Sequence, residues 1–244
     1  MIDVRDLTKR YRKKLVLDQV TFGCRPGTVT GFLGPNGAGK STVLRILASL
    51  TAATSGTATV HGCRYRDLPE PATRVGLMLD TSALHRGRTG RETLAVTALQ
   101  LGLTADRIGE MLDTVGLSTA ESRRRIGDYS LGMRQRLGLA HALLGRPDVL
   151  MLDEPANGLD PAGIRWLRGF LRGYAAEGGT VLLSSHQLTE IEAVADRFVI
   201  ISGGRIVADG SRADLLGSSA ASLEDVYLYL TSAGRRDTYL EGAA

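Results

Sequence analysis

The sequence lacks long apolar runs, signal-peptide features and cysteine clusters. No apolar stretch approaches the roughly 20 residues that a membrane-spanning helix needs, and residues 1–10 contain no apolar signal core. Cys24 and Cys63 are the only cysteines, and they lack the paired spacing of a zinc site. We therefore expect two buried, reduced thiols in a cytoplasmic chain, whose membrane role, if it has one, must come from a partner.

Charge of one sign is also scarce. The 30 lysines and arginines against 26 aspartates and glutamates give a formal net charge of only +4. The basic residues are spread along the chain, apart from one local cluster made of Lys9, Arg10, Arg12, Lys13 and Lys14. This distribution argues against nucleic acid as a partner and is compatible with a surface near anionic lipid.

The chain length and apolar content fit one domain with a small subdomain. The 244 residues, of which 43% are apolar, can bury a full core. Short β-type runs separated by turns occupy the first third of the chain, at 2–7, 20–24, 29–33, 57–61 and 75–79. Residues 91–146 then show a helical pattern, which is broken at Gly102, Gly116 and Gly127. We expect a helical insertion there.

The alternation of strands and helices resumes after the insertion. Strands are expected at 149–152 and 180–184, helices at 161–176 and 187–195, and a hairpin at 198–208. Such alternation predicts a parallel sheet flanked by helices.

A short tail, residues 211–244, follows Gly210. It contains one pattern of an amphipathic helix, made by Leu223, Val226, Tyr227 and Leu230. The sequence leaves open whether this tail packs on the rest of the chain or takes part in dimer or partner contacts.

A glycine-rich loop follows the expected strand at 29–33. Its residues are Gly34, Pro35, Asn36, Gly37, Ala38, Gly39, Lys40, Ser41 and Thr42, which fit the G-x-x-x-x-G-K-S/T pattern. A helix is expected next, because apolar residues recur at Val43, Leu44, Ile46, Leu47 and Leu50. Backbone N–H groups of such a loop point at phosphate oxygens. Lys40 would neutralise β- and γ-phosphate charge and the Ser41 hydroxyl would bind Mg²⁺, so the sequence predicts ATP and Mg²⁺ as cofactors.

An apolar strand ends in two carboxylates at Asp153 and Glu154. Asp153, at the strand tip, is suited to hold the Mg²⁺ shell, and Glu154 is suited to orient and polarise the attacking water. The alternative is an acidic turn after a core strand. The phosphate-binding loop favours the catalytic interpretation.

These residues resemble the ABC ATPases. The segment 129–136, Tyr-Ser-Leu-Gly-Met-Arg-Gln-Arg, is similar to the ABC signature and lies shortly before the acidic strand. The resemblance implies that Ser130 and Gly132 contact the γ-phosphate of ATP bound to a second subunit. Ser130 at a capped helix start is the alternative, and the two are compatible because a capped helix start is itself an anion site.

Three further segments carry the resemblance. Residues 157–160 resemble the D-loop that links the two sites, His186 resembles the switch histidine that contacts the γ-phosphate, and Tyr11 matches the aromatic residue that stacks on adenine. The implied fold is α/β, a P-loop NTPase (RecA-like) parallel sheet core with an N-terminal antiparallel β subdomain. Residues 1–210 would form the nucleotide-binding domain, in which a helical subdomain at about 91–146 carries the signature.

Two departures from the family pattern stand out. Asp80 occupies the place after strand 75–79 where the family usually has a glutamine that ligates Mg²⁺, and the carboxylate is still able to ligate the metal. Leu131 and Met133 replace the usual glycine and glutamine of the signature, and we expect a retuned contact with the second subunit, not a lost one.

The variant signature, the Asp80 position, the tail and the single-cassette length resemble ATP-binding subunits of bacterial drug and antibiotic exporters. The resemblance implies a homodimer of nucleotide-binding subunits, peripheral on the inner face of the cell membrane, with a separately encoded transmembrane permease. Three alternatives stay open: a soluble iron–sulfur assembly ATPase, a regulatory module with weakened catalysis, and an importer. The transported molecule is not readable from these residues.

Overall fold

The computed structural model describes residues 1–217 and 222–240, with side chains described up to 232. A three-stranded antiparallel sheet has the order β2-β1-β4, with β1 at Ile2–Tyr11, β2 at Lys14–Cys24 and β4 at Ser55–Val60. A second sheet has the order β5-β6-β7-β3-β8-β9. Its strands are β5 (Val75–Met78), β6 (Val149–Asp153), β7 (Thr180–Ser185), β3 (Val29–Leu33), β8 (Arg197–Ser202) and β9 (Arg205–Gly210). All its pairings are parallel except that of β9 with β8.

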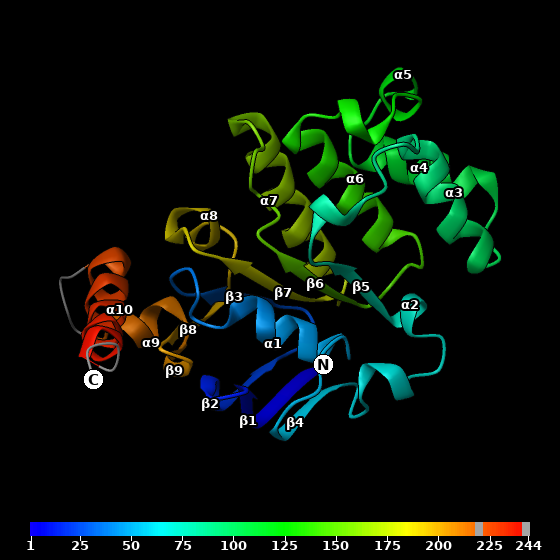
Figure 1. Cartoon of the computed structure of the whole chain (residues 1–244). Coiled ribbons are helices and arrows are strands. Elements are labelled where there is room, and N and C mark those ends of the chain that lie inside the picture. Colours follow the sequence, from blue (N-terminus) through cyan, green and yellow to red (C-terminus); the bar gives the residue numbers. More distant parts are fainter. Residues whose placement is uncertain (218–221, 241–244) are drawn as a thin grey trace.

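Helices cover both faces of the six-stranded sheet (Figure 1). One face carries α6 (Leu131–Leu143), α7 (Pro161–Ala176) and α8 (Leu188–Glu192), and the other carries α1 (Lys40–Leu47) and the antiparallel sheet. The insertion between β5 and β6 begins with η2 (Thr81–Ala83) and holds α3 (Gly90–Gln100), α4 (Ala105–Thr114), α5 (Thr119–Ser122), η3 (Ile126–Asp128) and α6. The remaining elements are η1 (Tyr65–Asp67), α2 (Pro71–Arg74), α9 (Arg212–Leu216) and α10 (Leu223–Leu240).

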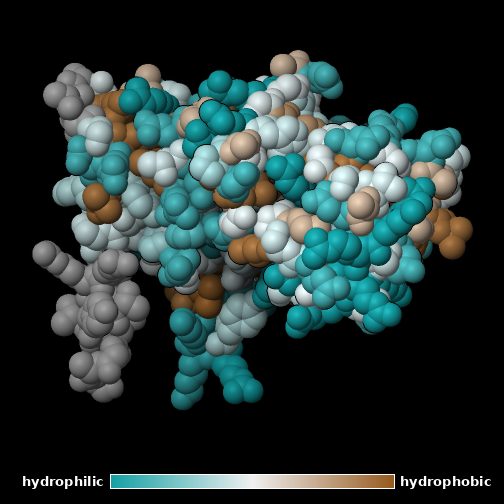
Figure 2. All heavy atoms as spheres, turned by 90° about the horizontal axis from the view of Figure 1, so that it is seen from above, coloured by the Kyte–Doolittle hydropathy of each residue, from teal (hydrophilic) through white to brown (hydrophobic). Residues whose placement is uncertain are grey.

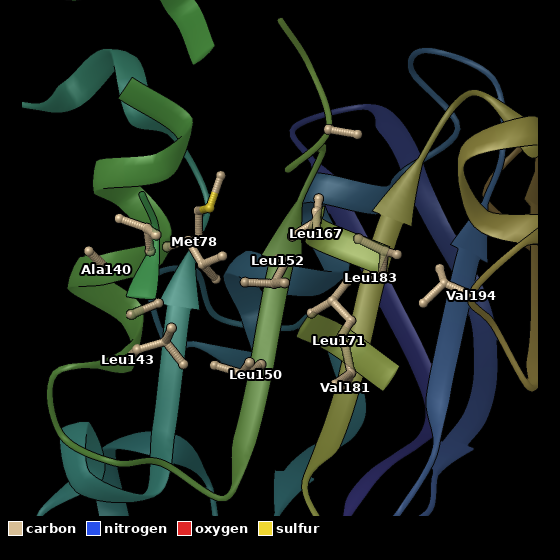
Figure 3. Packing of buried hydrophobic residues seen from close by; sticks show 14 of the residues in the cluster. Met78, Ala140, Leu143, Leu150, Leu152, Leu167, Leu171, Val181, Leu183 and Val194 are labelled. Atoms are coloured by element: carbon tan, nitrogen blue, oxygen red, sulfur yellow. The ribbon is translucent and has the colours of Figure 1, made fainter. Parts of the chain in front are cut away.

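The alternation of side chains along β6 builds two hydrophobic cores from one strand. Leu150 and Leu152 belong to the cluster that packs under α6 and α7, whereas Val149 and Met151 belong to the cluster shared with α1 and the antiparallel sheet. Figure 3 shows the first cluster, where Leu167 and Leu171 of α7 lie over the strands. A strand that is buried on both faces is apolar throughout, and this explains why Val149–Leu152 carries no polar residue.

The helical insertion is confirmed, and two of the expected breaks end helices as glycines usually do. Gly102 and Gly116, after α3 and α4, have φ of 65° and 67°, in the left-handed region that favours glycine. Capping boxes start α3 at Thr89 and α5 at Ser118. Seen from the side of the insertion, hydrophilic residues dominate the surface and hydrophobic ones form small scattered groups (Figure 2).

The described part of the tail packs on the rest of the chain through the start of α10. Leu223 and Tyr227 of α10 are buried in the same cluster as the α7 leucines. The expected hairpin is also confirmed: β8 and β9 pair antiparallel around Gly203 and Gly204, which both have positive φ. Within residues 1–217 and 222–240, we find no helix with the length and apolarity needed to cross a bilayer.

Several expectations from the sequence were wrong in detail. Leu50 lies beyond α1 and is 67% exposed, because the helix ends at Leu47 and Ser49 turns the chain with φ of 57°. Cys24 is buried as expected, but Cys63 is exposed in the turn after β4. The helix expected at 187–195 is shorter, spanning Leu188–Glu192, and β1 and β2 are longer than expected because they form one hairpin.

Candidate functional site

The phosphate-binding loop connects β3 to α1 and leaves room only for glycine at two positions. A Cβ on Gly34 would collide with the carbonyl oxygen of Ile201 in β8. Gly39 has φ of 113°, and a Cβ there would lie 2.5 Å from Cδ2 of Leu17 in β2. The loop therefore packs between β8 and β2, and the close approach of their atoms determines its backbone conformation.

Lys40 opens α1, and its side chain is buried beneath the loop. Its Nζ donates hydrogen bonds to the carbonyl oxygens of Gly34, at 2.7 Å, and Pro35, at 3.4 Å. Nζ also lies 3.7 Å from Oε1 of Glu154, and the side chain is only 7% exposed. Burial lowers the pKa of Lys40, while the carboxylates of Glu154 and Asp153 oppose that shift. A buried ammonium with carboxylates nearby is well placed to bind phosphate oxygens.

Asp153 and Glu154 meet the end of β7, because β6 and β7 pair with Asp153 opposite Ser184. The Ser184 hydroxyl donates a hydrogen bond to the Asp153 carboxylate. The Glu154 N–H donates to the Ser184 carbonyl oxygen at 3.1 Å. Glu154 has φ of 51°, a left-handed conformation that side-chain-bearing residues rarely adopt. This turn directs the Glu154 carboxylate toward Lys40.

The Glu154 carboxylate lies between two nitrogen groups. One oxygen faces Lys40, and the other, Oε2, lies 2.9 Å from Nδ1 of His186, the residue that follows β7. The Glu154 side chain keeps 20% exposure and His186 keeps 34%, so small molecules can reach both. A fixed, partly exposed carboxylate beside an imidazole can accept a proton from a water molecule. The structure thus brings together Lys40, Asp153, Glu154 and His186, as expected from the sequence.

The residues expected to bind Mg²⁺ supply oxygen donors of the type that this ion prefers. Ser41 follows Lys40 in the first turn of α1, and Asp153 ends β6. Asp80 caps η2, where its carboxylate accepts hydrogen bonds from the Ser82 N–H at 2.9 Å and hydroxyl at 2.6 Å. These bonds lower the pKa of Asp80, and the charge of Arg45 on α1 adds to the effect. The donor set fits the ion, although Asp80 would have to share its carboxylate with Ser82.

Tyr11 and the signature residues Ser130 and Gly132 each contact other groups of the same chain. Tyr11, at the end of β1, is 45% exposed, and the Lys9 ammonium lies 4.6 Å from its ring centroid. Ser130 caps α6 by accepting the Met133 N–H at 3.1 Å. A Cβ on Gly132 would lie 2.8 Å from the Gly158 carbonyl oxygen, so α6 starts directly against the 157–160 segment. The roles of these residues toward nucleotide stay predictions.

Two residues of the site were not assigned a role from the sequence. Ser184 is hydrogen-bonded to both the Asp153 carboxylate and the Glu154 backbone. The available signal was a pair of serines at the end of a buried strand. Gln135 of α6 donates from Nε2 to the Glu154 carbonyl oxygen at 3.4 Å. No sequence signal could have found that contact, because it depends on how α6 packs.

Comparison with known proteins identifies a family model and curated relatives. The family model described as ABC transporter matches residues 17–157. The lantibiotic transport ATP-binding protein SrtF of Streptococcus pyogenes is 37% identical over 211 residues, which cover 86% of this chain and 90% of that protein. The bacitracin transport ATP-binding protein BcrA of Bacillus licheniformis is 39% identical over 212 residues, which cover 86% of this chain and 69% of that protein.

Solved structures give the same architecture. A structure described as the ATP binding subunit of an ABC transporter aligns with a TM-score of 0.85 at 32% identity, covering 95% of this chain and 99% of that one. A dimeric bacterial ABC transporter cassette aligns with a TM-score of 0.78 over 86% of this chain and 98% of that one. The second pair is 21% identical, so that similarity shows the fold alone. The expected α/β P-loop fold with its helical insertion is confirmed.

Proposed function

The chain belongs to the ABC transporter family as an ATP-binding and ATP-hydrolysing subunit, and we propose that it energises export of an antibiotic or other hydrophobic compound. The observation that carries the ATPase assignment is the convergence of Lys40 and His186 on the Glu154 carboxylate. An antibiotic as the transported compound is supported by the names of SrtF and BcrA, which are lantibiotic and bacitracin transport ATP-binding proteins. These relatives do not favour the iron–sulfur assembly alternative or the regulatory module.

Glu154 acts as the general base in the proposed mechanism. Its carboxylate orients a water molecule toward the γ-phosphorus and takes up the proton of that water. His186, hydrogen-bonded to the other carboxylate oxygen, fixes the direction of that carboxylate and contacts the γ-phosphate. Lys40 binds the β- and γ-phosphate oxygens and stabilises the charge that develops on them.

The remaining parts of the proposal concern cofactors and assembly. The loop 34–42 cradles the phosphates and Tyr11 stacks on adenine. Ser41, Asp153 and Asp80 would hold Mg²⁺, which would supply positive charge to the phosphates. Residues 1–210 form the nucleotide-binding domain, with its helical part at about 91–146.

Two copies of the chain would form the working unit. Ser130 and Gly132 of one copy close over ATP that is bound by the other, so each site draws on both copies. The dimer acts at the inner face of the membrane through a separately encoded permease.

The test measures ATP turnover against protein concentration while light scattering follows dimer formation in ATP and Mg²⁺. We expect wild-type turnover to rise with concentration. Glu154→Gln should lower turnover by a factor on the order of 10²–10⁴ and accumulate an ATP-bound dimer, because removing a positioned base leaves binding intact. Turnover that survives this substitution would remove Glu154 from the mechanism.

Glu190→Gln is the matched control for the same chemical change. Glu190 accepts a hydrogen bond from the Ser185 hydroxyl at 2.7 Å, one residue before His186. This variant should keep wild-type turnover within about twofold, because its carboxylate is held by Ser185 and not by Lys40.

A further inference from the structure

The signature helix α6 rests on the segment that follows the catalytic carboxylate. Gly132 approaches the Gly158 carbonyl oxygen so closely that only glycine fits there. Leu131 occupies the space beside Gly158, where a Cβ would lie 2.5 Å from the leucine Cγ. One turn further along α6, Gln135 reaches the Glu154 carbonyl oxygen. One face of α6 therefore follows the chain from Glu154 to Gly158.

The backbone of Glu154 is hydrogen-bonded to three parts of the molecule. Its carbonyl oxygen accepts the Asn157 N–H at 3.2 Å, which closes the turn into the 157–160 segment. It also accepts the Nε2 of Gln135 at 3.4 Å, while the Glu154 N–H is bound to Ser184 of β7. A residue with φ of 51° depends on its surroundings to keep that conformation. These bonds hold the backbone from which the Glu154 side chain extends.

Packing alone gives no reason for a glutamine at position 135. The residue is only 7% exposed, and it lines a small cavity in which Arg136 is the one other charged or amide residue and Met78, Leu139 and Leu159 are among the apolar ones. Its Oε1 is buried without a hydrogen-bond partner among the described residues, and that is unfavourable for stability. An apolar side chain of the same length would fill this space without that cost. The amide is better explained by its bond to Glu154.

We infer that Gln135 is a positioning residue, which ties the placement of the signature helix to the orientation of the general base. This inference rests on the proposed role of Glu154. At 3.4 Å the bond is near the long end of hydrogen-bond distances, and such bonds often tighten in the reacting complex. A shift of α6 toward the sheet shortens the bond and aligns the Glu154 peptide. The carboxylate is then set for proton transfer only when α6 is in place.

The test replaces the amide by an apolar chain of equal length, in Gln135→Met. Steady-state kinetics should show kcat lowered about fivefold to tenfold, the size expected for one lost hydrogen bond. The KM for ATP and the midpoint of thermal unfolding should stay near wild type, because the ATP-binding groups are untouched. A wild-type kcat, or a loss that appears only in KM, would overturn the inference.

Thr97→Val is the matched control, because it removes a different contact of α6. It removes the 2.8 Å hydrogen bond between Thr97 of α3 and Nε2 of His141, near the other end of α6. We expect an unchanged kcat. An equal loss of kcat in this variant would show that any weakening of α6 slows turnover, and the specific role of Gln135 would be wrong.

A second measurement separates positioning from folding and dimer closure. In the Glu154→Gln background, Gln135→Met should leave the ATP-bound dimer fraction unchanged, because closure does not need the base. A reduced fraction would assign Gln135 to closure and contradict the inference. Normal ATP hydrolysis by Glu154→Gln would contradict the proposed function. Normal hydrolysis by Gln135→Met, with Glu154→Gln inactive, would contradict only the inference about Gln135.

Discussion

The candidate site has a phosphate half around Lys40 and Glu154 and a signature half around Ser130. The two halves differ in how much of each is formed by a single chain. In the phosphate half, the side chains of Lys40, Glu154 and His186 are at most 34% exposed, and Lys40 and His186 both contact Glu154. In the signature half, Ser130 only caps its own helix and Leu131 is 47% exposed. The first half is built to hold a ligand within the chain. In the second half Ser130 is exposed, as the proposed dimer requires.

The two halves also differ in what fixes their shape. Close backbone packing at Gly34 and Gly39, and the left-handed turn at Glu154, determine the phosphate half. Helix capping at Ser130 and the approach of Gly132 to Gly158 determine the signature half. Changes in the first half should therefore act on ATP binding and chemistry in one chain, while changes in the second should act only in the dimer.

Among the changes that separate the two halves, the largest expected effect comes from Lys40→Ala. Equilibrium binding of a labelled ATP analogue should weaken about 10- to 100-fold, since a charge-assisted hydrogen bond to phosphate is lost. Arg91→Ala is the control, because it removes one exposed positive charge on α3 and should keep normal affinity. Normal affinity in Lys40→Ala would contradict the assignment of the phosphate half.

Much of the phosphate half could be predicted from the sequence, because its residues are close together along the chain or end adjacent strands. The loop before Lys40 and the carboxylates after β6 follow from local patterns alone. The signature half was identified only through its family resemblance, since a serine before a helix is common. Gln135 and the depth of the Leu131 contact with Gly158 could not be predicted, because both depend on the tertiary packing of α6.

Predictions about the fold were wrong where a turn interrupts a local pattern of apolar residues. The apolar spacing that predicts α1 extends to Leu50, yet Ser49 adopts a left-handed φ and ends the helix earlier. Cys63 was expected inside because cysteine is usually buried, but it follows the left-handed pair His61 and Gly62 at the end of β4. Both failures come from backbone conformations that side-chain hydrophobicity does not report.

Ser130→Ala should have the next largest effect and tests the signature half. Turnover at high protein concentration should fall roughly tenfold through loss of a hydrogen bond to phosphate, whereas ATP affinity of the monomer should stay unchanged. Ser118→Ala is the matched control, because Ser118 caps α5 in the same insertion and its loss costs a similar amount, about 1 kcal/mol of stability. If both variants lose turnover equally, the effect is capping and the trans contact is unsupported.

Asp80→Gln should have a smaller effect and tests whether the phosphate half extends to the end of β5. Removing one carboxylate charge near the metal should raise the Mg²⁺ concentration for half-maximal turnover about fivefold. Asp214→Asn is the control, because Asp214 also accepts hydrogen bonds from a serine, Ser211, at a helix start. An unchanged Mg²⁺ requirement in Asp80→Gln would leave Asp80 with its capping role at Ser82 alone.

The smallest expected effect concerns His141, near the buried end of α6. Burial lowers its pKa from the ordinary 6.5, so the folded protein keeps the ring neutral while the unfolded chain takes up a proton below that pH. The free energy of unfolding should therefore fall as pH drops through 6.5. Hydrogen bonds from serines lower the pKa of Asp80 and Glu121 from 3.8 and 4.5, so their contribution is lost only at more acidic pH.

Urea unfolding at pH values between about 7.5 and 5.5 measures this dependence on His141. His141→Gln should flatten it, because an amide binds no proton, while His85→Gln, at an exposed position, should retain it. A flattened profile would show that α6 is anchored at the end that carries His141. If the pH profile is the same in His141→Gln as in the wild type, this end of the helix also opens to water. The two ends of α6 would then not differ in how firmly they are held.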